Sequence, residues 1–319
     1  MSYIVRSVSV AAAALCVLGT VAVAETRITY KSAKAGSSYY QMAVEISEAM
    51  KAGSDGEISV TVEESQGSVQ NVMEVRARGG DYVFTTPPAL IGLAQGGRAM
   101  FEGRESPAFD DIRALFPIPS LTMHFVMSAD SGVETFEDMA GKTILLGSGS
   151  FGAREGAKYI EMFGLADSVQ VADSELSNAV SALKNGQIDG FVTAGSYPAP
   201  NVIEAAASTG VSVLSLSDAQ VEESGRTRLV IPAGTYAGQT EDIVTTSLPV
   251  VAYTTTKMDD DTAYQLTRTY WETKAQMAGM SRWWDGVSTE MLSTITSEIH
   301  PGARRYYEEI GAPLNDAHM

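Results

Sequence analysis

The sequence has little cysteine, histidine or basic charge, and each shortage excludes a class of protein. One cysteine in 319 residues excludes a disulfide framework and a thiolate metal site. The three histidines lie far apart in the chain, which argues against a histidine metal site. With 22 basic and 39 acidic residues the formal net charge is −17, which disfavours nucleic acid and anionic membranes as partners. We therefore expect no metal site and no nucleic-acid partner.

Long apolar runs are missing after the N-terminus, so we predict no stable insertion into a membrane. The N-terminus itself differs. Arg6 precedes the weakly apolar run Val8–Ala24, which ends in Ala-x-Ala, the pattern of a cleaved secretory signal. A membrane-spanning helix is the alternative, but it needs about 20 strongly apolar residues. We expect residues 1–24 to be a signal peptide whose removal takes away Cys16 and leaves a periplasmic protein.

The remaining chain alternates strand patterns with helical ones, and its length suggests two domains. Its hydrophobic content of 45% and charged content of 19% are typical of a globular protein. Strands are predicted at residues 27–30, 58–63, 82–85, 142–146, 169–171 and 190–193. Helices are predicted at 39–50, 69–78, 153–163, 176–184, 201–207, 262–277 and 304–310. This alternation predicts βαβ units and mostly parallel sheets.

Two apolar segments that contain proline, residues 116–128 and 247–255, suit strands that cross between lobes. They bracket a middle lobe of residues 129–246. The first lobe is then discontinuous, with residues 25–115 plus 256–319. We predict two α/β lobes that close on a ligand, with hinges in the two crossing strands.

Five expected strand-to-helix junctions carry hydroxyl groups beside glycine or proline: residues 35–38, 65–68, 85–87, 147–150 and 194–198. In open α/β sheets ligands bind beyond the carboxyl ends of the strands, where helix N-termini offer free N–H groups. Such junctions suit a carboxylate, sulfonate or phosphate. Helix capping explains any single junction equally simply, but five of them spread over both lobes favour binding.

One junction has a second interpretation. Gly147–Gly152 fits G-x-G-x-x-G between a strand and a helix, and Asp173 follows the next strand, as in a dinucleotide site. A secreted NAD-binding oxidoreductase is therefore an alternative. The export signal counts against it, because soluble nicotinamide cofactors are scarce outside the cytoplasm. The chain has no Gly-x-Ser-x-Gly elbow and no histidine spacing that suggests a triad, so we expect no enzyme and no cofactor.

For a few single residues the sequence allows both a functional and a structural role. Arg154 lies in the first turn of its predicted helix, where a cation opposes the dipole, so it binds either a ligand carboxylate or a surface acid. Lys31 and Lys34 flank the first loop and are weaker ligand candidates. His124 and the pair Trp283-Trp284 fit packing better than function.

Several stretches carry a resemblance to a known family. They are Gly36-Ser37-Ser38-Tyr39-Tyr40, Ser65-Gln66-Gly67-Ser68-Val69-Gln70-Asn71, residues 131–133 with 138–142, and residues 186–191 with 194–198. In order and spacing the chain resembles the TAXI type of solute-binding protein, the extracytoplasmic receptor of tripartite ATP-independent periplasmic (TRAP) transporters. It departs from that pattern at Gln66, at Pro87-Pro88 and at Phe151, which would make the pocket smaller or more apolar.

The resemblance implies a two-lobed periplasmic-binding-protein fold of type II, each lobe a mixed sheet flanked by helices. It implies a receptor that captures a small organic anion, such as glutamate, 2-oxoglutarate or a C4-dicarboxylate, and delivers it to TRAP membrane subunits. A sensory adaptor that binds the same ligand is an alternative. The residues expected to contact the ligand are Ser37, Ser38, Tyr39, Gly67, Ser68, Thr85, Thr86, Ser148, Gly149, Ser150, Phe151, Arg154, Gly195 and Tyr197.

Overall fold

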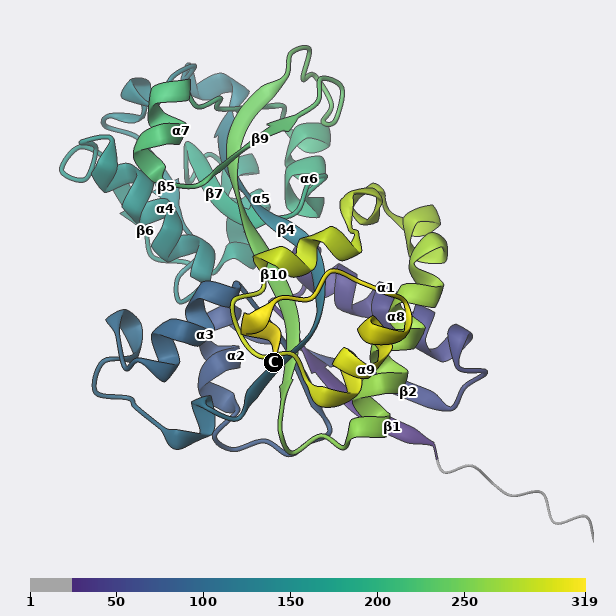
Figure 1. The fold of residues 1–319 in the computed structure, drawn as a ribbon. Coiled ribbons are helices and arrows are strands. Elements are labelled where there is room, and N and C mark those ends of the chain that lie inside the picture. The colour runs from purple at the N-terminus through teal and green to yellow at the C-terminus, as the bar shows by residue number, and fades with distance from the viewer. Residues whose placement is uncertain (1–24) are drawn as a thin grey trace, which may run out of the picture.

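The computed structural model describes residues 25–319, and the predicted signal peptide lies outside these residues. Over the described residues the strands form one ten-stranded sheet, in which eight follow the order β2-β1-β3-β10-β4-β7-β5-β6. The long strands β4 (Ile112–Ser128) and β10 (Ile243–Thr255) pair antiparallel at its centre and run through both halves of the molecule (Figure 1). Because both strands pass from one half into the other, they also border the space between the halves.

The first half contains three parallel strands, β1 (Thr26–Lys31), β2 (Ile58–Glu63) and β3 (Tyr82–Thr86). Its helices are α1 (Ser38–Gly53), α2 (Ser68–Glu74), α3 (Pro88–Gln95), α8 (Asp260–Met280) and α9 (Pro301–Glu309). Helix α8 packs against both α1 and α9, so the C-terminal part of the chain returns to the N-terminal half (Figure 1).

The second half repeats the parallel arrangement with β5 (Thr143–Leu145), β6 (Gln170–Ala172) and β7 (Gly190–Gly195). Its helices are α4 (Phe151–Met162), α5 (Ala179–Lys184), α6 (Pro200–Ser208) and α7 (Asp218–Ser224). The strands β8 (Val211–Val213) and β9 (Thr227–Ile231) pair antiparallel with β4 and β10.

The expectation of mostly parallel sheets is wrong for the sheet as a whole. Antiparallel pairing joins β10 to β3, β4 and β9, and joins β4 to β7 and β8. The physical reason is that β4 and β10 pass through both halves in opposite directions and therefore oppose the strands beside them. The local βαβ pattern predicts parallel pairs within each half but says nothing about the crossing strands.

The crossing strands pair irregularly where both contain proline. Leu248 pairs with Leu121 and Val250 with Ile118, so Pro249 and Pro119 fall where the register shifts. Proline lacks an N–H group and is tolerated at such a bulge. The lobe boundaries and the hinge in residues 116–128 and 247–255 stay a prediction.

His124 on β4 is packed in the interior, as the sequence favours. It is fully buried, with Nε2 2.8 Å from the Tyr236 hydroxyl and Nδ1 3.2 Å from the Thr122 carbonyl oxygen. The Tyr236 hydroxyl also accepts the Ala199 N–H group. Burial lowers the pKa of His124 to about 4, because the charged imidazolium loses its hydration.

This burial predicts a pH-dependent stability. The unfolded imidazole takes up a proton near pH 6.5 and the folded one only near pH 4, so acidification through this window favours unfolding by up to about 3 kcal/mol. We expect His124→Gln, whose amide can replace the contact with Tyr236, to lose stability less steeply than the wild type between those pH values. Urea unfolding at several pH values measures this, and parallel curves for the two proteins would contradict it.

Candidate functional site

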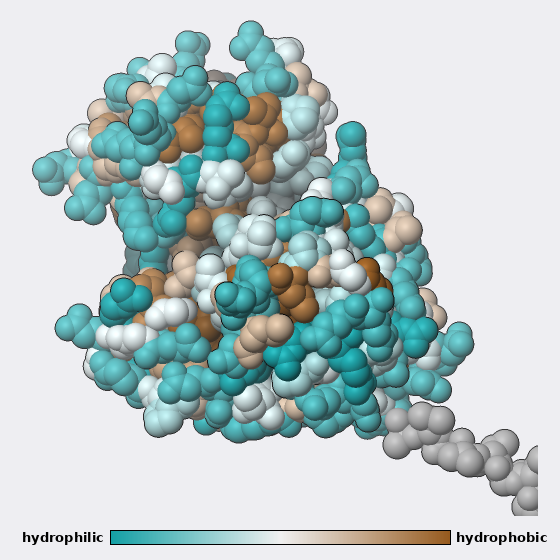
Figure 2. Space-filling view, in the orientation of Figure 1, coloured by the Kyte–Doolittle hydropathy of each residue, from teal (hydrophilic) through white to brown (hydrophobic). Residues whose placement is uncertain are grey.

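A cavity lies between the two halves, at the carboxyl ends of β1, β3, β5 and β7, and Figure 2 shows the surface hollowed there. From the first half it is lined by Ser32, Ala33, Lys34, Ser37, Tyr39, Gln66, Gly67, Ser68 and Thr85. From the second half it is lined by Gly147, Ser148, Ser150, Phe151, Gly152, Glu175, Leu176, Val192 and Ala194. Leu121 and Val250 of the crossing strands complete the wall.

The cavity is small. Its volume is about 60 Å³. A cavity of this size suits a small organic molecule better than a dinucleotide.

Two helices from opposite halves begin at this wall. Ser37 caps α1 and accepts the Tyr40 N–H at 3.2 Å, and Ser150 caps α4 and accepts the Ala153 N–H at 2.9 Å. The N–H groups of the first two residues of each helix then have no intrahelical acceptor. The two predicted roles are compatible here, because the serines cap the helices while Tyr39, Phe151 and Gly152 of the first turns line the cavity.

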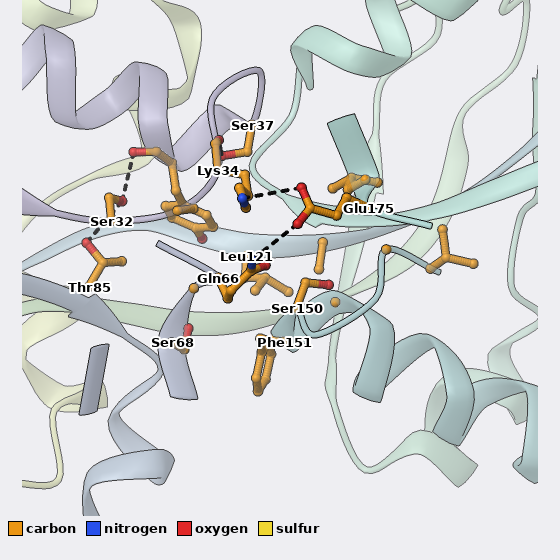
Figure 3. Close-up of a pocket in the computed structure, with 18 of the residues that line it drawn as sticks. Ser32, Lys34, Ser37, Gln66, Ser68, Thr85, Leu121, Ser150, Phe151 and Glu175 are labelled. Carbon is orange, nitrogen blue, oxygen red and sulfur yellow. Dashed lines mark hydrogen bonds and ion pairs between the residues drawn. The ribbon is translucent and has the colours of Figure 1, made fainter. Parts of the chain in front are cut away.

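The hydroxyl groups around the cavity differ in how they are used. Thr85 Oγ1 donates to the Tyr30 hydroxyl at 3.0 Å, and Ser148 Oγ donates to Asp173 at 2.6 Å. Ser68 Oγ lines the cavity and makes no hydrogen bond to any described residue. The Ser68 hydroxyl is therefore free for a ligand, and Ser150 Oγ, which only accepts the Ala153 N–H, also keeps its O–H group free (Figure 3).

Six of the predicted contact residues lie outside the cavity lining: Ser38, Thr86, Gly149, Arg154, Gly195 and Tyr197. Ser38 and Thr86 are buried, and their hydroxyl oxygens have no partner among the described residues. A Cβ on Gly195 would collide with Ser38 Oγ. Gly195 thus permits close approach of β7 to the start of α1, a positioning role in place of the expected ligand contact.

The three remaining residues outside the cavity lining are Gly149, Tyr197 and Arg154. Gly149 has a φ of +80°, which favours glycine in its turn. Tyr197 is half-buried and packs against the apolar cluster of the second half. Arg154 forms no salt bridge within residues 25–319, and its Nη1 is buried without a partner. The surface acid considered for Arg154 is therefore not found among the described residues, and its contact with a ligand carboxylate stays a prediction.

Lys34, Gln66 and Glu175 form a polar bridge across the cavity that the predicted contact set does not include. Lys34 Nζ lies 3.3 Å from Glu175 Oε2, and Gln66 Nε2 lies 3.4 Å from Glu175 Oε1 (Figure 3). Lys34 and Gln66 belong to the first half and Glu175 follows β6 in the second. Lys34 and Gln66 had a signal, since Lys34 flanks the first loop and Gln66 lies in the junction 65–68, whereas Glu175 had none. The wall residues Leu121 and Val250 lie in the predicted crossing segments.

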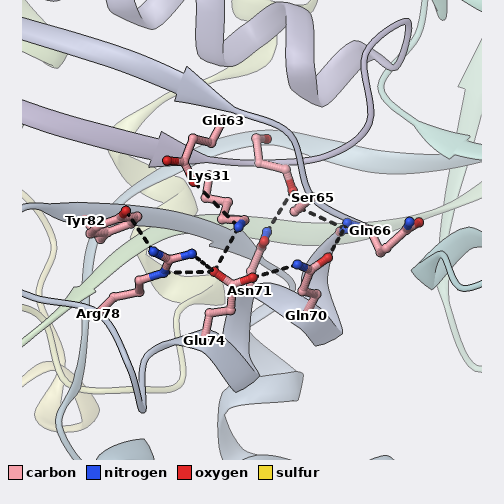
Figure 4. Close-up of polar contacts among 11 residues, drawn as sticks. Lys31, Glu63, Ser65, Gln66, Gln70, Asn71, Glu74, Arg78 and Tyr82 are labelled. Atoms are coloured by element: carbon pink, nitrogen blue, oxygen red, sulfur yellow. Dashed lines mark hydrogen bonds and ion pairs between the residues drawn. The ribbon is translucent and has the colours of Figure 1, made fainter.

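A buried network supports the first half of the wall. Asn71 Nδ2 donates to the carbonyl oxygens of Ser32 at 2.7 Å and Thr85 at 2.9 Å, and so joins the ends of β1 and β3. Beside it, Lys31 pairs with Glu74 at 2.9 Å and with Glu63 at 3.6 Å (Figure 4). Lys31 is thus committed to this network and does not line the cavity.

The charge of Glu74 is stabilised by the same network. Burial alone would raise the pKa of Glu74, but hydrogen bonds from Lys31, Gln70 and Arg78 outweigh burial and hold the pKa below its usual range. Gln70 in turn accepts the Gln66 N–H at 2.7 Å (Figure 4). The network therefore reaches from the buried ion pairs to the edge of the cavity.

The glycine-rich loop has a structural explanation. Gly147 and Gly149 have positive φ, and a Cβ on Gly152 would lie 3.0 Å from Ala194 Cβ, so α4 packs closely on β7. Asp173 accepts the hydrogen bond from Ser148 and so holds its own loop. This arrangement, together with the small cavity, favours a small ligand over the dinucleotide.

Comparison with known proteins assigns a family. The model of the NMT1-like family matches residues 31–311. The chain belongs to the NMT1-like family. This match spans both halves of the sheet and every residue that lines the cavity.

Solved structures similar to this NMT1-like protein include a periplasmic binding protein and a protein with bound malate. One is the periplasmic binding protein BugD, with a TM-score of 0.58, 11% identity, and coverage of 90% of this chain and 98% of that one. Another is MatC from Rhodopseudomonas palustris with bound malate, with a TM-score of 0.57, 12% identity, and coverage of 89% and 97%. The NMT1-like chain has the predicted two-lobed periplasmic-binding-protein fold, with mixed α/β lobes.

Two further observations concern the described part of this NMT1-like chain. None of its helices combines the length and the apolar character needed to cross a bilayer. Nor do residues 25–319 bring together three or more histidine, cysteine, aspartate or glutamate side chains in a group that could hold a metal ion.

Proposed function

We propose that this protein is a periplasmic solute-binding receptor that captures a small organic anion between its lobes. The observation that carries the proposal is the convergence of α1 and α4 on one cavity, which is lined by their capping serines, Ser37 and Ser150, and by residues of both first turns. Helix N-termini bind carboxylates without a neighbouring cation, because their N–H groups and dipoles are already in place. The free Ser68 hydroxyl adds a donor.

The lining residues support binding without reaction. They include serine and threonine hydroxyls but neither histidine nor cysteine, so no serine there has an imidazole base within the described wall. The two charged lining residues, Lys34 and Glu175, are paired with each other, so we propose that the ligand is released unchanged. MatC, which has this fold, holds malate, and this supports an organic acid as the class of ligand.

The resemblance to the TAXI type supports delivery to TRAP membrane subunits. On this proposal residues 1–24 direct export to the periplasm, and the lobes 25–115 plus 256–319 and 129–246 close by bending in residues 116–128 and 247–255. The register shift at Pro119 and Pro249 supports bending at that place, because fewer regular hydrogen bonds resist it.

Calorimetry with the mature protein tests the proposal against glutamate, 2-oxoglutarate, C4-dicarboxylates, monocarboxylates, amino acids and sulfonates. We expect at least one to bind. We also expect Ser68→Ala to weaken that ligand by roughly tenfold or more, since a hydrogen bond to a charged group contributes about 1.5–3 kcal/mol. Ser293→Ala, an exposed position away from the cavity lining, is the matched control. Failure of every one of these compounds to bind would overturn the proposal.

A further inference from the structure

We propose that Glu175 makes the cavity selective for a zwitterion, a ligand with one carboxylate and one ammonium group on a small apolar body, such as an α-amino acid with an aliphatic side chain. The inference rests on the proposed receptor function and names its ligand class. The first observation is the charge of the cavity lining. Lys34 and Glu175 are the charged side chains among the described residues that line the cavity, and they are paired with each other.

The pair leaves the cavity lining without net charge. Lys34 Nζ already lies 3.3 Å from Glu175 Oε2, so it is not an unpaired cation waiting for a second ligand carboxylate. A dicarboxylate would either place its second charge beside the Glu175 carboxylate or take Lys34 away from it. In both cases two carboxylates would share one cation, and their mutual repulsion makes this arrangement unfavourable.

Glu175 still has acceptor capacity. A carboxylate offers about four acceptor sites. Glu175 uses one contact on each oxygen, to Lys34 at 3.3 Å and to the Gln66 amide at 3.4 Å. Its side chain is 46% exposed and faces the cavity (Figure 3). An ammonium group with three N–H donors can occupy the remaining sites without breaking the pair with Lys34.

The rest of the wall fits the other parts of such a ligand. The starts of α1 and α4, with Ser68, suit its carboxylate. Leu121, Leu176, Val192 and Val250 provide an apolar surface for an aliphatic side chain. No third polar group is needed to satisfy this ligand, and the cavity volume accommodates only a small one.

The test uses matched ligands on the mature full chain. Calorimetry compares L-valine with 3-methyl-2-oxobutanoate, L-alanine with pyruvate, and both pairs with malate and succinate. We expect at least one amino acid to bind the wild type at least tenfold more tightly than its oxo acid and than either dicarboxylate. Glu175→Gln should weaken that amino acid tenfold or more while the oxo acid keeps or gains affinity.

Control variants separate selectivity from a general effect. Glu161→Gln, on the exposed side of α4, should leave every affinity unchanged. Lys34→Met removes the other member of the pair and should keep the amino acid ahead of its oxo acid. A uniform change of all affinities in Glu175→Gln would overturn the proposal and show that the pair only joins the lobes. Tighter binding of an oxo acid or a dicarboxylate to the wild type would overturn it while the receptor function stands. If no compound binds, both proposals fail.

Discussion

Asn71→Asp is expected to lower the free energy of unfolding by about 3–5 kcal/mol at neutral pH, because it buries a charge without a partner. Asn71 is fully buried, and its Nδ2 donates to the carbonyl oxygens of Ser32 and Thr85. An ionised carboxylate in its place would face two acceptors and accept nothing from them. Since Ser32 and Thr85 both line the cavity, ligand affinity should fall as well.

The pH dependence of this variant identifies the cause. Burial among acceptors raises the pKa of the introduced carboxyl group above its unfolded value near 3.9. Its destabilising effect is therefore smallest at low pH, where the protonated group can donate one hydrogen bond, and grows as the pH rises. Asn71→Leu also loses both hydrogen bonds but cannot ionise, so its deficit relative to the wild type should not change with pH. Urea unfolding between pH 5 and 8 compares the two variants, and a constant deficit in Asn71→Asp would contradict this account.

The strand-and-helix order of the two halves could be predicted because local signals carry it. The alternating apolar pattern of residues 58–63 corresponds to β2 in both bounds. The apolar spacing of residues 39–50 found α1, which extends to Ser38–Gly53. These elements bury one face each, so the period of their apolar residues records which face that is.

Residues 209–246 carry weaker signals, and no element was predicted there. β8 and β9 are short strands with mostly half-exposed residues, so their apolar pattern is faint. Helix α7 did have a usable signal. Ser217 and Gln220 form a capping box at its start, and Gly225 ends it with a φ of +62°.

In the site, too, the residues with local sequence signals could be predicted and the contacts between distant residues could not. Residues at strand-to-helix junctions were predicted, and the cavity lining includes Ser37, Tyr39, Gly67, Ser68, Thr85, Ser148, Ser150 and Phe151. The bridge from Gln66 to Glu175 joins residues 109 positions apart in different halves. No local rule relates two such positions, because their contact depends on how the lobes are placed. The composition of the loops therefore predicted many of the residues that line the cavity, and tertiary structure decides which charges meet there.

The second large effect concerns a buried carboxylate on α1. Glu45 is 4% exposed and accepts N–H groups from Trp284 at 2.6 Å and Trp283 at 3.1 Å, and the O–H group of Ser281 at 2.6 Å. It thereby ties α1 to the segment that follows α8. Glu45→Leu would leave these three donors, and the weaker donor Gln41 Nε2 at 3.4 Å, without their acceptor. Each lost acceptor for a buried donor costs about 1–3 kcal/mol, so we expect a loss of about 4 kcal/mol in the free energy of unfolding.

A matched pair of variants tests whether the lost acceptor is responsible. Glu45→Gln keeps an oxygen that can face the two indole N–H groups and places an NH₂ group where the Ser281 hydroxyl can accept, so its loss should be about 1 kcal/mol. Glu48→Ala, exposed on the same helix, should change stability by less than about 0.5 kcal/mol. Chemical denaturation followed by tryptophan fluorescence reports all three, since both indoles contact the carboxylate directly. Equal losses in Glu45→Gln and Glu45→Leu would mean that the negative charge itself, and not its acceptor oxygens, holds the two segments together.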